Sequence, residues 1–343
     1  MRDGTKPLVI AAPEPRSLDL IFTDAARADL HDRYEVFECT ADEVAGLPDE
    51  VLSRARFIIG QPPLDRAAVD KLSSVRCIFN VESNLILNMP YEVLFERGIH
   101  VVTTGAVFAE PVAEIGLAFA LDLARGVIDA DLDFREGREL WGGDGNARAR
   151  LLSGSDIGIV GFGDLGRALN RLLGGFRANI RVFDPWLPGS VLRDQGVEPA
   201  SLETVLAESD FVFVVASVTS ENQGFLGAAE LATMRRGASF ILLSRAGVVD
   251  FDALMDAVRS GQIMAASDVF PEEPLPRDHP VRQLPGFLRS AHRAGALDIA
   301  FKRMGDMVLE DMALVNLDLP PLRCKRAERE TVSRMRSKPV SRN

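Results

Sequence analysis

The stretch DIGIVGFGDLGRALNRLLGGF (residues 156–176) decides the fold of this chain. An apolar run ends at Gly161, and a helical pattern opens at about Asp164. Gly161, Gly163 and Gly166 have the spacing GxGxxG, which is typical of a strand-to-helix turn that binds a dinucleotide. The first glycine permits the turn, the second lets a pyrophosphate approach the backbone, and the third lets the helix pack on the strand.

An acidic residue follows the turn at the spacing that a dinucleotide site needs. About twenty residues on, the apolar run IRVFD (residues 180–184) ends in Asp184. A carboxylate there accepts hydrogen bonds from ribose hydroxyls and repels a 2′-phosphate, so we expect NAD rather than NADP. The alternatives are a tight turn without cofactor and an ordinary turn aspartate before Pro185.

Short apolar runs alternate with amphipathic stretches on both sides of this turn, which predicts two parallel sheets covered by helices on both faces. Helical patterns in the first part of the chain cover residues 18–33, 65–74 and 90–98. The runs expected to be strands are residues 7–12, 34–39, 56–60, 75–81 and 99–104, then 156–161, 180–184, 211–217, 239–244, 264–269 and 287–291.

The longest helical pattern covers residues 110–137. Its apolar positions are dense enough for burial nearly all round, and Pro111 suits a first helical turn. We expect a helix that links two domains and packs at an interface. The segment after about Asp318 is polar and basic, and it either lies over the first domain or is partly disordered.

Composition excludes several classes of protein. A chain of 343 residues has room for two domains, and 39 basic against 50 acidic residues argue against a nucleic-acid-binding face. No run approaches the roughly 20 apolar residues of a membrane span, and the N-terminal segment does not resemble a signal peptide. The cysteines Cys39, Cys77 and Cys324 lack CxxC spacing, so we expect neither disulfides nor a metal site, and a cytoplasmic protein.

Three polar residues follow strands of the second series. Arg245 closes SFILLSR, Glu273 lies in the loop after MAASDV, and His292 closes FLRSA. Arginine pairs with a carboxylate and polarises a carbonyl, while histidine moves a proton and a neighbouring carboxylate orients its ring. Together they are the groups needed to reduce a 2-oxo acid with a nicotinamide, although each alone has an ordinary structural explanation.

Four motifs carry a family resemblance. VGFGDLGRAL (160–169), LLSRAGVVDFDAL (242–254), ASDVFPEEPLPRDHPV (266–281) and SAHRAG (290–295) resemble motifs of the D-isomer-specific 2-hydroxyacid dehydrogenases, such as phosphoglycerate dehydrogenase and hydroxypyruvate reductase. The resemblance runs from about NVESN (80–84) to HRAG, with a looser match before it.

This resemblance implies an α/β architecture of two doubly wound domains. A flavodoxin-like substrate domain would comprise residues 1–108 and 299–343, and a Rossmann NAD-binding domain residues 109–298, with the active site in the cleft between them. It also implies homodimers joined through the NAD domains, largely by the linking helix.

The resemblance also assigns roles to residues. It implies that Arg245, Glu273 and His292 are catalytic, and that the backbone around Glu82 and Ser83, with Asn84 nearby, binds the substrate carboxylate together with Arg245. The residues expected at the cofactor are Gly161, Gly163, Asp164, Leu165, Gly166, Asp184, Ser217, Arg245, Asp268 and His292.

Departures from the family pattern leave the substrate open. Leu242 and Leu243 stand where the family usually has a polar pair, Ala291 replaces a usual proline, and VESN (81–84) replaces a glycine-rich loop. The glutamate, serine and asparagine of VESN favour a polar, sugar-acid-like substrate. Two alternatives stay open: an NAD-responsive, corepressor-like binding protein, and an enzyme for a substrate such as formate or phosphite.

Overall fold

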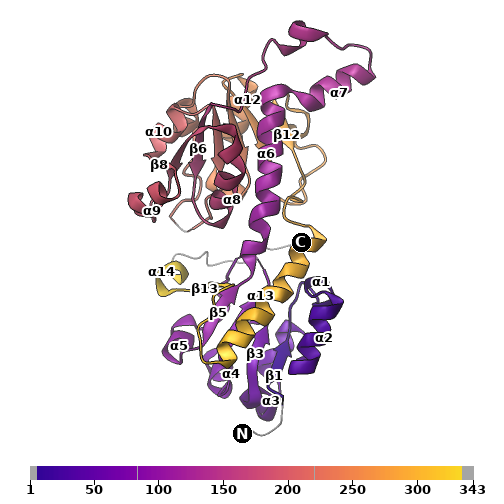
Figure 1. Cartoon of the computed structure of the whole chain (residues 1–343), viewed down its shortest axis with the longest axis vertical. Coiled ribbons are helices and arrows are strands. Elements are labelled where there is room, and N and C mark those ends of the chain that lie inside the picture. Colours follow the sequence, from indigo (N-terminus) through magenta and orange to yellow (C-terminus); the bar gives the residue numbers. More distant parts are fainter. Residues whose placement is uncertain (1–5, 83, 220, 334–343) are drawn as a thin grey trace. The chain divides into compact units, whose positions relative to one another are not determined.

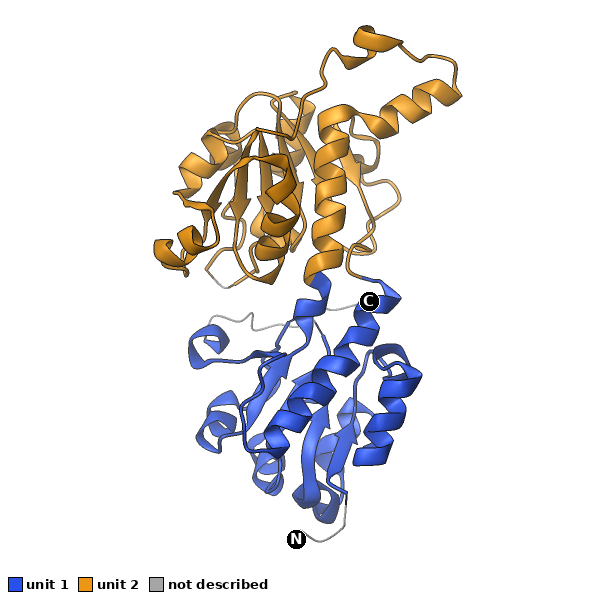
Figure 2. Cartoon of the chain, in the orientation of Figure 1, with its two compact units in different colours: residues 1–108, 296–343 blue, residues 109–295 orange. Residues whose placement is uncertain are grey.

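A computed structural model describes residues 6–82, 84–219 and 221–333, and the chain divides into two compact units. Unit 1 is built from both ends of the chain, residues 1–108 and 296–343, and unit 2 comprises residues 109–295 (Figure 2). Each unit is a sheet of mainly parallel strands covered by helices, as Figure 1 shows element by element. The expected pair of parallel-sheet α/β domains is therefore confirmed.

The sheet of unit 1 has the strand order β2-β1-β3-β4-β5-β13. Its first five strands are parallel and β13 is antiparallel to β5, and the order 2-1-3-4-5 is that of flavodoxin-like sheets. The strands are β1 (Leu8–Ala11), β2 (Glu35–Glu38), β3 (Ala55–Ile59), β4 (Cys77–Asn80), β5 (His100–Thr103) and β13 (Lys325–Arg326).

Helices bury both faces of this sheet because its side chains alternate. Val9 and Ala11 face a core with α1 (Leu18–Ile21), α2 (Asp24–Arg33) and α13 (Asp298–Asn316). Leu8 and Ile10 face the other core, with η1 (Ala41–Gly46), α3 (Asp49–Arg54), α4 (Arg66–Lys71) and α5 (Tyr91–Glu96). The single helix expected over residues 18–33 is two helices, because Phe22 is extended and Thr23 caps α2 by accepting the Ala26 N–H.

The sheet of unit 2 has seven parallel strands in the order β12-β11-β10-β9-β6-β7-β8. The order reverses between β6 and β9, and open α/β sheets bind ligands beyond the carboxyl ends of their strands at such a point. The strands are β6 (Asp156–Val160), β7 (Asn179–Phe183), β8 (Glu198–Pro199), β9 (Phe211–Val214), β10 (Ala238–Leu242), β11 (Ile263–Ser267) and β12 (Phe287–Arg289).

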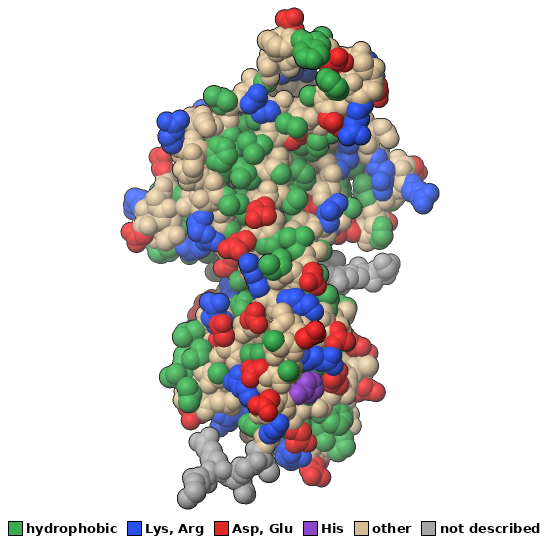
Figure 3. All heavy atoms as spheres, turned by 45° about the vertical axis from the view of Figure 1, so that its right-hand side comes forward, with side chains coloured by type: hydrophobic (Ala, Val, Ile, Leu, Met, Phe, Trp, Pro, Cys, Tyr) green, Lys and Arg blue, Asp and Glu red, His purple; other side chains and the backbone are tan. Residues whose placement is uncertain are grey.

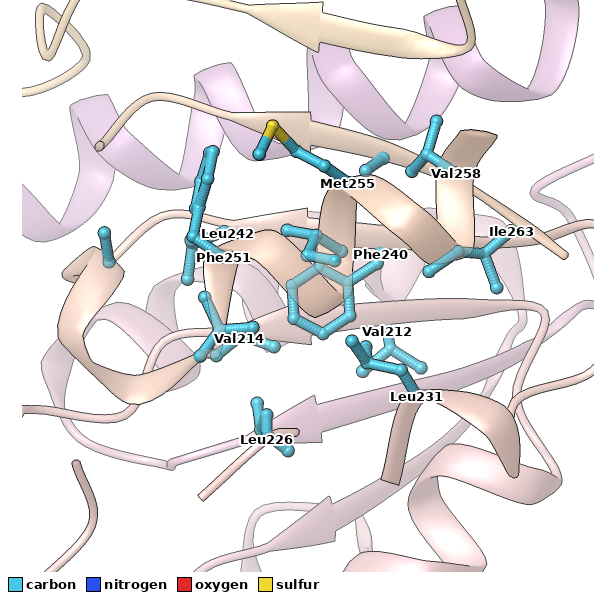
Figure 4. Close-up of a cluster of buried hydrophobic side chains, with 14 of the residues drawn as sticks. Val212, Val214, Leu226, Leu231, Phe240, Leu242, Phe251, Met255, Val258 and Ile263 are labelled. Atoms are coloured by element: carbon cyan, nitrogen blue, oxygen red, sulfur yellow. The ribbon is translucent and has the colours of Figure 1, made fainter. Parts of the chain in front are cut away.

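Two cores hold unit 2 together. On one face Val212, Phe240 and Leu242 meet Leu231 and Met255 (Figure 4), which come from α11 (Ala228–Ala232) and α12 (Phe251–Arg259), and α10 (Leu202–Ala207) joins this core. The other face packs on α6 (Ala109–Arg125) and α8 (Asp164–Leu173), while α9 (Gly189–Asp194) follows β7. The helix that opens after the glycine turn is therefore a core element.

The linking helix differs from the expectation. It is not one continuous helix but α6 followed by α7 (Val127–Arg135), because Gly126 between them adopts a left-handed conformation with φ of 65°. α6 has a buried side, whereas none of the residues of α7 is buried. Burial nearly all round is therefore wrong for this segment. α7 and the following η3 (Gly142–Asn146) project from the body of unit 2 (Figure 1).

The described part of the C-terminal segment lies on unit 1. After α13, β13 pairs with β5, and α14 (Arg329–Val332) follows. Asp311 of α13 is fully buried and accepts the N–H groups of Leu322, Arg323 and Cys324, which fixes the approach to β13. Within the described residues, no helix is both long and apolar enough to cross a membrane.

Candidate active site

The glycine turn follows β6 at the point where the strand order reverses. Gly161 has a φ of 93°, and a Cβ there would lie 2.7 Å from backbone atoms of Ala216. A Cβ on Gly166 would lie 2.6 Å from the carbonyl oxygen of Gly161. The fold therefore requires both glycines.

Gly163 is different, because neither packing nor conformation requires a glycine there. It has an ordinary φ of −74°, and no protein atom lies within 4 Å of where its Cβ would be. It caps the N-terminus of α8, whose first N–H groups have no partner within the helix, and it offers no side chain of its own to them. The open space beside Gly163 thus lets an anion approach the helix terminus, which fits a dinucleotide pyrophosphate.

Asp184 is tied to this turn. Its Oδ2 accepts the N–H of Phe162 at 2.8 Å, and its Oδ1 accepts that of Trp186 at 3.0 Å. Each carboxylate oxygen can accept a further bond, so ribose hydroxyls still find acceptors there. Asp164 and Leu165 form the first turn of α8, where Asp164 is exposed and Leu165 packs partly on the core.

Ser217 lies in the loop after β9, the strand next to β6. Its carbonyl oxygen accepts the side-chain amide of Asn222 at 2.8 Å, while Asn222 Oδ1 accepts the N–H of Thr219 at 2.7 Å. These bonds shape the loop beside the glycine turn, at the carboxyl end of the sheet.

Arg245, Glu273 and His292 come together at the carboxyl ends of β10, β11 and β12, which are neighbours in the sheet. His292 Nδ1 lies 2.5 Å from Glu273 Oε2, and Glu273 Oε1 accepts the N–H of Phe270 at 2.8 Å. The histidine side chain is 41% exposed, so the pair is open at the surface of unit 2.

The surroundings of Glu273 favour its charged form. Burial raises the pKa of this carboxyl, but the hydrogen bonds from His292 and Phe270 and the charge of Arg245 outweigh burial, and the net pKa is lowered. Glu273 is therefore ionised at neutral pH and can only accept hydrogen bonds. The proton in this contact consequently lies on Nδ1 of His292, which leaves Nε2 for other partners.

Asp268, expected at the cofactor, has its carboxylate engaged by the protein. It is 2% exposed, its Oδ1 accepts the N–H of Arg293 and the Ser290 hydroxyl, and its Oδ2 accepts the N–H of Ala294. Its main-chain carbonyl accepts the N–H of His292, which has a left-handed φ of 48°. Asp268 thus holds the segment that carries His292.

The residues expected at the substrate carboxylate lie in unit 1, after β4. The N–H of Glu82 already donates to Asn80 Oδ1 at 2.7 Å, and its carboxylate pairs with Arg16 at 3.2 Å. The carbonyl of Asn84 accepts the side-chain amide of Asn80 at 2.8 Å. Ser83 lies outside the described residues.

Sequence reasoning missed the part that Asn80 plays, although a signal was present. A polar residue closed an apolar run at the carboxyl end of a parallel strand, where ligands bind. The apolar departures Leu242 and Leu243 have a simple explanation, because they are 0% and 4% exposed and enter the two cores of unit 2. A Cβ on Gly116 of α6 would lie 2.5 Å from the Leu243 side chain, so α6 packs closely on the end of β10 at this point.

Comparison with known proteins identifies the family of the chain. Residues 117–294 match the family model described as D-isomer specific 2-hydroxyacid dehydrogenase, NAD binding domain. The chain belongs to this family: it is an oxidoreductase of the CH–OH group of 2-hydroxy acids with an NAD-binding domain.

Two curated relatives and one solved structure illustrate the similarity. The chain is 35% identical over 231 residues to a glyoxylate reductase of Korarchaeum cryptofilum, covering 66% of this chain and 69% of the relative. It is 29% identical over 234 residues to a D-3-phosphoglycerate dehydrogenase of Methanocaldococcus jannaschii, covering 66% of this chain and 43% of the relative. The crystal structure of a phosphoglycerate oxidoreductase from Rhizobium etli has 71% identity and a TM-score of 0.89, covering 94% of this chain and 99% of that one.

Proposed function

We propose that this chain interconverts a small D-2-hydroxy acid and the corresponding 2-oxo acid with NAD as cofactor. The observation that carries the proposal is the 2.5 Å contact between His292 and ionised Glu273, beside Arg245 and on the same sheet edge as the dinucleotide turn. When bound, the nicotinamide supplies or accepts the hydride. The residues of the chain supply binding, orientation and the proton.

Each residue of the trio has one role in this proposal. The Arg245 guanidinium pairs with the substrate carboxylate and polarises the adjacent carbonyl oxygen. His292 Nε2 gives a proton to that oxygen in the reductive direction and takes it back from the hydroxyl in the oxidative direction. Glu273 fixes the orientation of the imidazole ring through Nδ1. The contacts with a substrate carboxylate that were expected of Glu82, Ser83 and Asn84 stay a separate prediction.

We propose NAD rather than NADP because Asp184 lies where a 2′-phosphate would approach. Its bond to the Phe162 N–H holds the carboxylate beside the glycine turn, and a phosphate there would meet a fixed negative charge. We also propose that the nicotinamide binds near Asp268. The segment that the Asp268 carboxylate holds, rather than the carboxylate oxygens themselves, would contact the nicotinamide.

The test is the absorbance at 340 nm with purified protein, NADH or NADPH, and a panel of 2-oxo acids. Because relatives are named for glyoxylate and phosphoglycerate, glyoxylate and 3-phosphohydroxypyruvate head the panel, followed by hydroxypyruvate, pyruvate and sugar-derived oxo acids. We expect oxidation of NADH that falls at least about a thousandfold in His292→Asn, with NADH affinity kept.

Three outcomes would count against the proposal. Turnover that survives in His292→Asn contradicts the proton-transfer role. Oxidation of NADPH alone contradicts the role of Asp184. Tight NADH binding without turnover of any 2-oxo acid favours a binding function over catalysis.

We further propose a homodimer joined through unit 2, with the arm formed by residues 127–151 at the interface. No residue of α7 or η3 is buried, so the arm has no core of its own. Apolar side chains nevertheless gather on the arm and on the adjoining surface of unit 2 (Figure 3). Phe134 and Trp141 are in ring contact although 62% and 75% exposed. A second copy of the chain would cover these side chains by a two-fold contact.

The oligomeric state tests this part of the proposal. Leu140 on the arm and Leu317 in unit 1 are 70% and 71% exposed, so they form a matched pair. We expect Leu140→Asp to weaken or abolish the dimer in light scattering after size exclusion, and Leu317→Asp to leave it intact. Identical behaviour of the two variants would rule out the arm as the interface.

A further inference from the structure

The arm formed by residues 127–151 leaves the body of unit 2 and returns to it without a core of its own. None of its residues is buried, and α7 and η3 project from the unit (Figure 1). α7 has nine residues, and a helix of this length is marginal in water unless its surroundings stabilise it. The position of the arm therefore depends on how its two ends are held.

Asp122 holds the departing end. It lies in the last turn of α6, and its Oδ1 accepts the N–H of Ile128 at 2.8 Å. Ile128 is the second residue of α7, where an N–H lacks a partner within the helix, and Asp122 supplies one. The Asp122 carbonyl also accepts the N–H of Gly126, at the bend between the two helices. These contacts set the direction in which α7 leaves α6.

Arg150 holds the returning end. Its backbone N–H donates to the carbonyl of Ala124 at 2.9 Å, in the same last turn of α6. The last carbonyls of a helix lack partners within it, so this bond also satisfies an acceptor. Both ends of the arm are thus attached to one helical turn, although they are distant in the chain.

The side chain of Arg150 reaches into the sheet of unit 2. Its Nη2 donates to the Ser239 hydroxyl at 2.6 Å, and its guanidinium lies 4.5 Å from the centroid of the Phe211 ring. Ser239 and Phe211 are both 0% exposed and are partners across β10 and β9. They lie where these strands begin, at the end of the sheet opposite the candidate active site. Arg150 therefore joins the arm to a rigid part of the core without touching the candidate catalytic residues.

The arm that is held in this way is the most apolar exposed segment of unit 2. It carries seven of the sixteen large apolar side chains that are exposed among the described residues: Val127, Ile128, Leu132, Phe134, Leu140, Trp141 and Leu151. Two of its aspartates pair with arginines of the arm itself, Asp131 with Arg135 and Asp133 with Arg138. A second copy of the chain presents the same apolar patch, so a two-fold contact covers both patches at once.

We propose that Arg150 anchors the arm in the conformation that a second copy of the chain binds, so that assembly depends on a residue that adds no apolar side chain to the contact. This inference rests on the homodimer proposed above and deepens it. A surface that is ordered before binding loses less conformational entropy when its partner arrives. Releasing the arm should therefore weaken the dimer although every apolar side chain of the arm is kept.

The test compares Arg150→Met with Arg235→Met. Arg235 is a matched control, because it pairs with Asp156 and Asp210 at 3.1 Å at the same end of the sheet but does not belong to the arm. We expect the dimer Kd, measured by sedimentation with fluorescence detection, to rise about tenfold or more in Arg150→Met. In Arg235→Met we expect it to stay within about threefold, although each variant loses stability in urea.

A second readout follows the arm itself without a partner. In the Leu140→Asp variant, which we expect to be monomeric, trypsin can cleave after the exposed Arg135 and Arg138. Adding Arg150→Met should speed these two cleavages about tenfold, because proteolysis follows the population of the released arm. Adding Arg235→Met should leave their rates unchanged.

Ser239→Ala replaces Arg150→Met in both measurements if the latter does not fold. It removes the acceptor of the guanidinium and keeps the arm sequence intact, and we expect smaller changes in the same direction. An unchanged dimer Kd in the folded variant, an equal rise in Arg235→Met, or unchanged cleavage of the arm overturns the inference. A wild-type protein that is monomeric at every concentration instead overturns the proposed homodimer.

Discussion

Replacing Asp268 by asparagine tests how the chain holds its histidine. The carboxylate accepts the N–H of Arg293 on Oδ1 and that of Ala294 on Oδ2, so both oxygens serve as acceptors. Asparagine offers one oxygen, and its NH₂ group must face one of these N–H donors. The variant thus creates a local repulsion in the segment that carries His292.

The magnitude follows from burial. Asp268 and Ala294 are each 2% exposed, so water cannot replace the lost acceptor. Loss of a hydrogen bond to a buried charged acceptor costs about 2–3 kcal/mol of the free energy of unfolding. The segment can relieve this cost by moving, and a shift of His292 by about 1 Å lowers kcat about 100-fold.

The assay is steady-state turnover at saturating NADH, with the Kd of NADH and urea unfolding measured on the same samples. Asp311→Asn is the matched control, because Asp311 is a fully buried carboxylate whose two oxygens also accept backbone N–H groups, but in unit 1. We expect both variants to lose similar stability and only Asp268→Asn to lose kcat.

Two results would refute the reasoning. If Asp268→Asn keeps kcat while losing as much stability as Asp311→Asn, the carboxylate does not position His292. If it keeps kcat but loses NADH affinity, Asp268 binds the cofactor directly.

Two further predictions concern titratable groups. Because the pKa of Glu273 is lowered from 4.5, its contact with His292 contributes stability above about pH 4.5 and loses it as the pH falls through the folded-state value. The urea midpoints of wild type and Glu273→Gln should therefore differ at pH 7 and converge towards pH 3; a constant difference would contradict this origin. Burial raises the pKa of all three thiols, but Cys77 and Cys324 are buried whereas Cys39 is only partly buried, so at pH 8 a thiol-specific colorimetric reagent should titrate only Cys39 in the native protein and all three cysteines in urea. Rapid reaction of two thiols in the native protein would show that one of the buried cysteines becomes exposed.

Local signals in the sequence predicted most of the fold. The strands were found because short apolar runs between breakers report burial on both faces of a sheet, which depends on near neighbours. The glycine turn was found from its spacing, although only Gly166 is required by a contact close in the chain, with the carbonyl of Gly161, whereas Gly161 is required by the distant Ala216. The break at Gly126 was missed because the apolar pattern continues through it, although none of the residues of α7 is buried.

The candidate site was predicted in part. The residue types and strand ends indicated Arg245, Glu273 and His292, and these three lie together in unit 2. The use of Asp268 was not predictable, because a carboxylate at a strand end looks the same whether it faces a ligand or the backbone. Asn80 was missed although it closes an apolar run at a strand end, because only hydrogen-bond directions show that its amide binds the loop after β4.

The sequence by itself determined the two α/β sheets, the dinucleotide turn and the set of chemical groups, because these follow from periodicity, glycine spacing and residue type. Only the tertiary structure decided which polar groups act outward and which are used inside. That choice depends on strand order: β10, β11 and β12 bring Glu273 to His292 across 19 residues, and β3, β4 and β5 bring Gln61 and Thr103 to Asn80. Such contacts arise between segments distant in the chain, so no local pattern records them.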